Sequence, residues 1–327
     1  MTPSSSSAQP TLIEQWNQFW FTPIDPATLG VVRIGIGCML AYSHLVWAIG
    51  SDAFFGSQSW LNASAVTAIG NGSWSTSPLW WLQESPALLG LTHMAAFVTA
   101  ICLAIGLLTR AAAIVSFCFV LAYAHRNPAA LYGFDQVIGF MTLYLAIGPS
   151  GSTFSLDEYL TPTRHRVRSS IGANVATRLM QLHLCVLYFF AGVSKLKGVT
   201  WWNGFAIWGA IANQEYQTVD LTWLASWPII INLMTQVSVW WEVSYPALVW
   251  NRHTRPVMLA LAVAVHLGIG ACFGMLTFGC AMLLANFTFI PPHVVRTAVT
   301  NLKTVLNASS KRQPHLPPME VTPLPTT

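Results

Sequence analysis

Long apolar runs alternate with short polar segments over most of the chain. A helix needs roughly 20 apolar residues to cross the hydrocarbon core of a bilayer, which is about 30 Å thick. Eight runs reach or approach this length, near residues 28–49, 88–108, 111–125, 133–148, 174–194, 228–250, 257–273 and 275–290. Two of them are short, and the glycine-rich stretch 268–274 fits either one bent helix or a break between two. The pattern predicts an all-α, polytopic membrane helical bundle of about eight transmembrane helices, give or take one.

The segments outside these runs predict a simple domain organisation. Residues 1–11 are polar and serine-rich, which predicts a disordered tail. Residues 12–21 place a leucine and three aromatic side chains on one helical face, which predicts a short helix in the membrane interface. We therefore expect one transmembrane domain over 12–292 and a largely disordered cytoplasmic tail over 293–327.

Composition agrees with the pattern and excludes other classes. Hydrophobic residues make up 54% of the 327 residues and charged residues only 8%, whereas soluble domains carry about 25% charged residues. The lipid bilayer is therefore the expected partner. The chain contains no phosphate-binding loop, dinucleotide fingerprint or basic–aromatic patch, so no nucleic acid partner is predicted. Nothing in the pattern predicts an oligomeric state.

Basic residues gather in alternate loops between the predicted spans. They are Arg110, Arg164, Arg166, Arg168, Arg252, Arg255, Arg296, Lys303, Lys311 and Arg312. With eight crossings and a cytoplasmic N-terminus, all of them fall on the cytoplasmic side, as the positive-inside rule requires. The loop at 51–87, on the opposite side, contains no Lys or Arg. The charges predict a multi-pass protein of the cell (inner) membrane with both termini in the cytoplasm.

Several polar side chains are predicted near the outer ends of the spans. They are His44, His93, His125, Arg126, Asn127, Asp135, Lys195 and His266. Ionisable groups within a membrane are costly, so each one is a functional hypothesis. The histidines come from four helices and lack the HxxxH spacing of a metal site, so no metal is predicted.

One predicted helix carries a polar seam along its length. Arg178, Gln181, Cys185, Tyr188, Gly192 and Lys195 follow a 3-4-3-4-3 spacing and so share one face. The seam ends in Lys195, and two interpretations remain open for this residue. A partly desolvated lysine can become a general base, whereas a lysine at a helix end can also simply snorkel to the interface.

Glu242 lies near the middle of the span at 228–250. Arg33 and Arg178 are the expected partners, since an unpaired charge at this depth would be very unfavourable. A structural ion pair is the first interpretation, and a proton or ion pathway is the alternative.

An ordered series of motifs resembles one family. The motifs are Tyr188-Phe-Phe-Ala-Gly-Val-Ser-Lys195-Leu196 with Trp202-Asn-Gly204, His125-Arg126-Asn127-Pro128 with Tyr132-Gly133 and Asp135, Phe154-Ser-Leu-Asp157, Glu242 with Pro246, and His266-Leu-Gly-Ile269. Over about residues 12–292 the chain resembles the HTTM (horizontally transferred transmembrane) domain. This domain forms the membrane part of vitamin K-dependent gamma-carboxylase and is similar to sporulation-delaying-protein-B-like bacterial membrane proteins.

The resemblance implies chemistry for particular residues. It places the carboxylase's catalytic lysine base, which deprotonates a reduced quinone, at Lys195, and a supporting histidine at His125. Arg126 would stabilise developing negative charge. Asn127, Asp135, Tyr188, Trp202 and His266 are the expected substrate-binding residues. The chain departs from the carboxylase at Ser194, where the carboxylase has a second lysine. It also departs after the predicted spans, where the carboxylase has a large soluble region that this sequence does not show. Peptide carboxylation is therefore not implied.

Two hypotheses follow for the function. In the first, the protein is a carboxylase/epoxidase-like enzyme with an outward-facing pocket, in which Lys195 acts on a quinol or other lipid-soluble substrate. In the second, it is a non-enzymatic transporter or a peptide maturation or immunity factor. The second predicts that Glu242, Arg33 and Arg178 matter more than Lys195.

Overall fold

The computed structural model describes residues 10–310 except 63–64, 67, 69–76, 163–165, 167 and 216, and for 308–310 it describes the backbone alone. The expectations for residues 1–9 and 311–327 therefore lie outside the described part of the chain. The same holds for Arg164, Lys311 and Arg312, which entered the charge argument.

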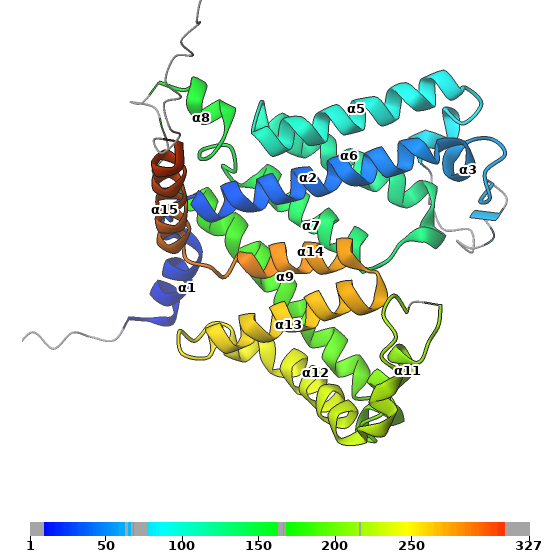
Figure 1. Ribbon diagram of the computed structural model, residues 1–327. Helices are drawn as coiled ribbons and strands as arrows, with labels where there is room; N and C mark the ends of the chain where they lie inside the picture. Colours follow the sequence, from blue (N-terminus) through cyan, green and yellow to red (C-terminus); the bar gives the residue numbers. More distant parts are fainter. Residues whose placement is uncertain are drawn as a thin grey trace, which may run out of the picture.

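The protein is an all-α, polytopic membrane protein, as the apolar pattern predicts (Figure 1). Eight bundle helices lie where the eight apolar runs were expected. They are α2 (Ala27–Ile49), α5 (Pro86–Ile105), α6 (Thr109–Arg126), α7 (Gly133–Ile147), α9 (Ile171–Lys195), α12 (Pro228–Leu248), α13 (Arg255–Phe273) and α14 (Leu276–Phe287). Within the described residues, extended pairing is limited to one isolated bridge between Ile24 and Ser170.

Length and apolarity alone assign fewer crossings than eight. In the part of the chain that the structure describes, four helices, α2, α5, α9 and α13, are long and apolar enough to span a membrane, and a bent pair of helices raises the number to five. Helix α7 has 15 residues and α14 has 12, so they are only about 22 Å and 18 Å long. The multi-pass architecture is established, and the count of eight crossings stays a prediction.

Local sequence sets the ends of the bundle helices. Helix α5 begins with Pro86 in its first turn, and the Ser85 side chain accepts a hydrogen bond from the backbone of Leu88. It ends at Gly106, whose left-handed φ of 72° suits glycine. A second left-handed glycine, Gly274, lies between α13 and α14, where the chain reverses. The glycine-rich stretch 268–274 therefore ends one helix before another begins, rather than bending a single helix.

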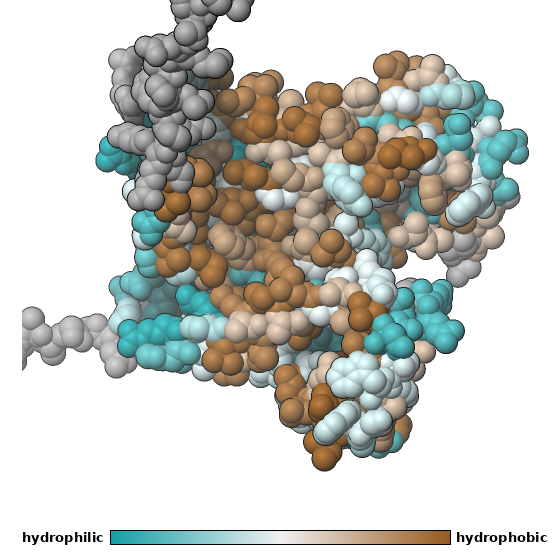
Figure 2. Space-filling model, in the orientation of Figure 1, coloured by the Kyte–Doolittle hydropathy of each residue, from teal (hydrophilic) through white to brown (hydrophobic). Residues whose placement is uncertain are grey.

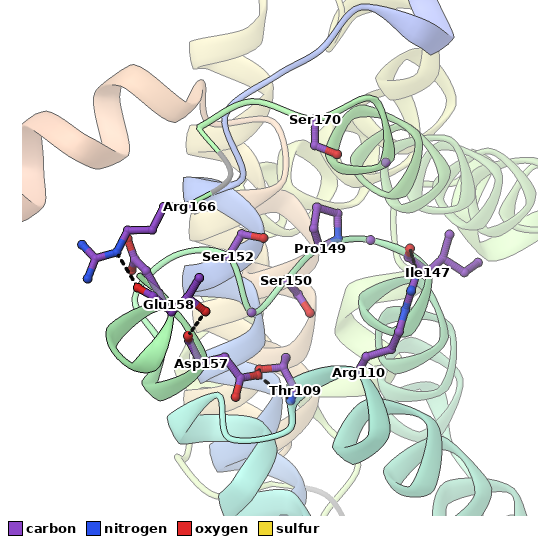
Figure 3. Close-up of a pocket in the computed structure, with 14 residues that line it drawn as sticks. Thr109, Arg110, Ile147, Pro149, Ser150, Ser152, Asp157, Glu158, Arg166 and Ser170 are labelled. Carbon is purple, nitrogen blue, oxygen red and sulfur yellow. Dashed lines mark hydrogen bonds between the residues drawn. The ribbon is translucent and has the colours of Figure 1, made fainter. Parts of the chain in front are cut away.

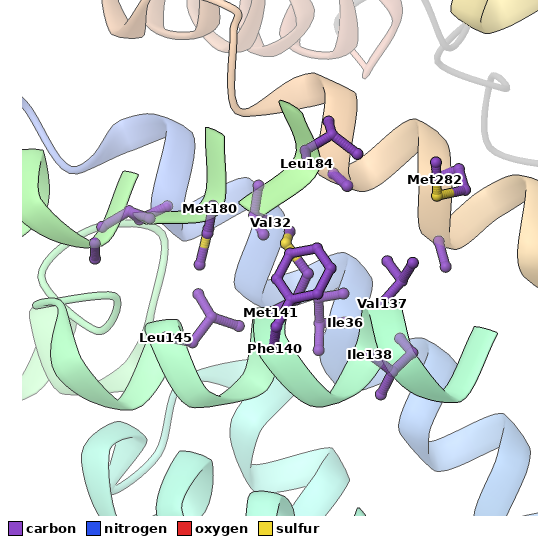
Figure 4. Close-up of a cluster of buried hydrophobic side chains, with 14 of the residues drawn as sticks. Val32, Ile36, Val137, Ile138, Phe140, Met141, Leu145, Met180, Leu184 and Met282 are labelled. Carbon is purple, nitrogen blue, oxygen red and sulfur yellow. The ribbon is translucent and has the colours of Figure 1, made fainter. Parts of the chain in front are cut away.

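The bundle core lies between α2, α7, α9 and α14 (Figure 4). Buried aliphatic, methionine and phenylalanine side chains from these four helices interdigitate there, among them Ile36, Met141, Leu184 and Met282. Apolar side chains also cover much of the face shown in Figure 2. Leu91, for example, is 66% exposed on α5, as expected for a helix face that contacts lipid.

Two helices lie across one end of the bundle. They are helix α1 (Leu12–Phe21) and helix α15 (Pro292–Ser310), which lie at the same end (Figure 1). Helix α1 is the short helix that the pattern predicts at 12–21. Helix α15 was not predicted, since residues 293–327 were expected to be a largely disordered tail. It follows α14 after a bend of 113°, and Arg296 of α15 pairs with Asp25.

Short helices complete the ends. They are α3 (Ser51–Phe55), η1 (Pro78–Trp81), η2 (Pro128–Ala130), α8 (Leu156–Leu160), α10 (Val199–Trp202), α11 (Ala206–Ile211) and η4 (Thr222–Ser226). Helices α3 and α11 lie at the end opposite α1 and α15 (Figure 1). The residues discussed next lie mainly at this opposite end.

Candidate functional site

Lys195 and Glu242 form an ion pair between two packed helices. Lys195 is the last residue of α9, and its Nζ lies 2.5 Å from Oε2 of Glu242 on α12. The two side chains are 22% and 12% exposed. Gly192 permits the approach, because a Cβ at this position would lie 2.9 Å from the backbone N of Val243. The lysine Nζ also lies 5.3 Å from the centre of the Trp201 ring, within cation–π range.

The structure corrects the expected partners of Glu242. Arg33 donates instead to the carbonyl of Phe154 at 2.5 Å. Arg178 donates to Oε1 of Gln181 at 3.0 Å and lies over the ring of Phe19. Arg178 lies about 25 Å from Lys195 along α9, at 1.5 Å per residue. The ion pair at Glu242 was expected, but its assignment to the two arginines was wrong because the register of α12 places Glu242 beside the opposite end of α9.

The Lys195–Glu242 pair lines an apolar cavity of about 520 Å³. The cavity lies among the end of α9 and helices α10 to α13, and most of its walls are aliphatic or aromatic. Lining residues include Ile207, Ile211, Leu221, Leu261, Val265 and Phe273. Ser238 and Cys272 also line it. This size and lining are typical of sites for lipid-soluble small molecules.

Tyr188 and His266 belong to a buried polar network rather than to the cavity wall. Asn286 Nδ2 donates to the Tyr188 hydroxyl at 2.8 Å, and Tyr245 donates to Oδ1 of the same asparagine at 2.6 Å. The Tyr188 hydroxyl is therefore free to donate its own proton to Nε2 of His266, 2.7 Å away. That donation assigns the remaining proton of a neutral His266 to Nδ1. The network joins α9, α12, α13 and α14, so it includes both helices that carry the ion pair.

Sequence reasoning missed Asn286 and Tyr245 as members of this network. Tyr245 lies three residues after Glu242, one turn along α12. Asn286 is only 5% exposed within α14. An amide inside an apolar run was the available signal, because a buried polar side chain in a membrane helix requires partners.

His125 and Arg126 do not join Lys195. Arg126 is fully buried and holds the loop after α3, donating to the carbonyls of Leu61 and Phe55 at 2.9 and 3.1 Å. Its guanidinium also lies 3.9 Å from the centre of the Trp80 ring. His125 is exposed beside it. Neither residue lines the cavity at Lys195.

Trp202 also lies outside this cavity. Its side chain is 56% exposed, and its indole nitrogen donates to the carbonyl of Leu196 at 2.7 Å. This bond ties α10 to the end of α9, which holds the neighbouring Trp201 against Lys195. Asn127 and Asp135, the remaining predicted substrate-binding residues, line a second cavity of about 330 Å³ between α2, α3, α6 and α7.

A third cavity, of about 420 Å³, lies at the end of the bundle that carries α1 and α15. Thr109, Arg110 and Asp157 are among the residues that line it (Figure 3). The Asp157 carboxylate accepts hydrogen bonds from the backbone N–H groups of Leu108 and Thr109 at 2.9 and 2.8 Å. Burial alone would raise the pKa of this carboxyl, but these hydrogen bonds outweigh burial and lower its pKa. Asp157 thus caps the first turn of α6.

These features define a class: a multi-pass helical membrane protein with an ion pair at the wall of an apolar cavity. The chain matches the model of the HTTM domain over residues 21–293, and it belongs to this family. The match confirms the family resemblance found in the motifs. No curated protein and no solved structure was found to match the chain.

Proposed function

We propose that this protein is a membrane enzyme that removes a proton from a weakly acidic, lipid-soluble molecule, such as a quinol, bound beside Lys195 and Glu242. The observation that carries the proposal is the ion pair at the wall of the apolar cavity. Its two members are the only charged side chains among the described residues that line this cavity. An apolar ligand there would therefore have one acid and one base as its charged neighbours.

The ion pair refines the role of Lys195. An ammonium group cannot accept a proton, so Lys195 first transfers its own proton to Glu242, which leaves a neutral amine and a neutral acid. Burial in an apolar cavity reduces the cost of this transfer, because low polarity penalises two charges more than two neutral groups. The amine then accepts the proton of the substrate hydroxyl. The new ammonium lies beside the new oxyanion, whose charge replaces that of Glu242.

The resemblance to the membrane part of vitamin K-dependent gamma-carboxylase supports the same role for Lys195. His125 and Arg126 have no part in the proposed step, since they lie elsewhere in the structure. Tyr188 and His266 position α9 and α13 around the cavity through their hydrogen bond. We place the site on the outer side of the cell membrane, opposite the loops that carry most of the arginines.

The competing hypothesis, a transporter or a peptide maturation factor, assigns the main role to Glu242, Arg33 and Arg178. A structure with no cavity at Lys195 would support that hypothesis. The cavity at Lys195 favours the enzyme over this hypothesis.

The proposal is tested with purified protein and a reduced naphthoquinone in air. Deprotonated quinol reacts with oxygen faster than the neutral form, giving quinone and hydrogen peroxide, so oxygen consumption reports proton removal. We expect Lys195→Ala to lower the accelerated rate by about a hundredfold or more, as for loss of a general base. The control is Lys197→Ala, an exposed lysine two residues away, which should keep the full rate.

A folded Lys195→Ala variant with the wild-type rate would contradict the proposal, as would a wild-type protein that does not accelerate the reaction. Mass spectrometry of lipid-soluble molecules that co-purify with the wild type, but not with Lys195→Ala, would identify the natural ligand.

A further inference from the structure

We propose that the second cavity, between α2, α3, α6 and α7, binds the ammonium group of a small organic cation. This cavity has a volume of about 330 Å³, which suits a small amine. It is separate from the cavity at Lys195. The turn between α13 and α14 lies between them, because Met275 lines the cavity at Lys195 and Thr277 lines the second one.

Aromatic side chains form much of the wall of this second cavity. Tyr42, Trp47, Phe54 and Tyr123 contribute from α2, α3 and α6. The rings of Trp47 and Tyr123 lie 4.6 Å apart. Ring faces carry partial negative charge and attract a cation placed against them, and sets of aromatic rings are a common way to hold alkylammonium groups.

Asp135 supplies a full negative charge. It lies in the first turn of α7, half-buried, and its carboxylate accepts a hydrogen bond from the backbone N–H of Tyr132 at 3.0 Å. Within the described residues it has no ion-pair partner, whereas Glu242, the other acid among the bundle helices, is paired with Lys195. An unpaired carboxylate in such a position is costly. No Lys or Arg is among the described residues that line this cavity, so a bound cation would neutralise the carboxylate.

Asn127 provides a further acceptor. It lines the cavity and is 7% exposed, and its Oδ1 has no hydrogen-bond partner among the described residues. Buried carbonyl oxygens are almost always paired. A carboxylate and an amide oxygen together suit a group that donates hydrogen bonds, which a primary ammonium does and a quaternary one does not. The cavity therefore favours a primary alkylammonium.

The first experiment compares three probes by calorimetric titration of the purified protein in sodium chloride. They are n-butylammonium, tetramethylammonium and butan-1-ol, a neutral molecule of similar size. We expect n-butylammonium to bind best, at least about tenfold more tightly than butan-1-ol. Equal affinities for the cation and the alcohol, or no binding of n-butylammonium, would overturn the proposal.

Variants locate the binding. Asp135→Asn removes the charge but can still accept from Tyr132, and it should weaken n-butylammonium binding by about tenfold or more. Phe54 is 37% exposed, so Phe54→Leu should fold even if Asp135→Asn does not. This variant should weaken the binding of n-butylammonium but not that of butan-1-ol. Phe54→Tyr, which keeps a ring, should bind like the wild type. Glu84→Gln removes an exposed acid outside the cavity and should change nothing.

Unchanged cation affinity in both Asp135→Asn and Phe54→Leu would contradict the site. Lys195→Ala should leave n-butylammonium binding intact, so this test stands or falls separately from the proposed enzyme activity.

The ammonium group could belong to a lipid headgroup or to a free amine, and nanodiscs distinguish the two sources. Protein in phosphatidylglycerol nanodiscs should bind n-butylammonium fully. If phosphatidylethanolamine in the nanodisc competes with the probe, the headgroup is the ligand; if it does not, the ligand is a free amine.

Discussion

At the scale of single residues, the Lys195–Glu242 pair should be strongly coupled. Lys195→Met leaves an unpaired carboxylate on Glu242, which is 12% exposed in the wild type, and Glu242→Gln leaves an unpaired ammonium on Lys195, which is 22% exposed. Each single variant should lose stability, and the double variant should lose less than the sum of the two. We expect a coupling of about 1–3 kcal/mol from a double-mutant cycle of unfolding in detergent. Additive losses would mean that the pair contributes nothing specific.

Asp157 makes a second prediction at this scale. Hydrogen bonds from the first turn of α6 hold the pKa of its carboxyl below the ordinary value of 3.8. A lowered pKa in the folded state stabilises the fold above the ordinary value, and this stabilisation is lost as the pH falls through the folded-state pKa. Asp157→Asn should therefore cost about 1 kcal/mol near pH 7, similar to loss of a helix cap.

The difference between Asp157→Asn and the wild type should shrink when the pH falls below 3.8. Melting temperatures of both proteins at neutral and acidic pH measure it. A difference that stays constant over this range would show that the charge of Asp157 is not what stabilises α6.

At the scale of helices, Gly192 should control the packing of α9 on α12. A Cβ at this position would lie 2.7 Å from Cγ2 and 2.9 Å from the backbone N of Val243, so α12 must shift to accept even an alanine. We expect Gly192→Ala to cost about 1–3 kcal/mol through overpacking and to lower the rate of the proposed reaction. Gly90→Ala is the matched control, since a Cβ there meets nothing within 4 Å. It should leave both properties unchanged or raise stability slightly.

Helices were more predictable from this sequence than the site. Each apolar run became a helix because a chain in lipid must satisfy its backbone hydrogen bonds within the segment. Lys195 was found from the seam along α9, which depends on helical spacing alone. Its partner was not found, because the pairing of Glu242 with Lys195 depends on the register of α12 relative to α9. Arg126 was expected beside Lys195 because both lie at helix ends, yet its contacts with Phe55 and Leu61 depend on the course of a loop.

At the scale of the whole molecule, the number of crossings determines where the two ends of the chain lie. Helices α1 and α15 lie at the same end of the bundle (Figure 1), which requires an even number of crossings between them. Length and apolarity alone assign four crossings to the described residues, or five if the bent pair of α14 and α15 is one span. That pair turns by 113°, however, so α15 does not continue the direction of α14. Reporter fusions that are active only in the cytoplasm should therefore give the same result at both termini, and both should be active. A cysteine at Ser57, beside α3, in a cysteine-free background should react with a membrane-impermeant maleimide from outside the cell.

Fusions that report opposite sides would require an odd number of crossings. Termini that are both outside would keep the even number but reverse the orientation, and would place the cavity at Lys195 on the cytoplasmic side.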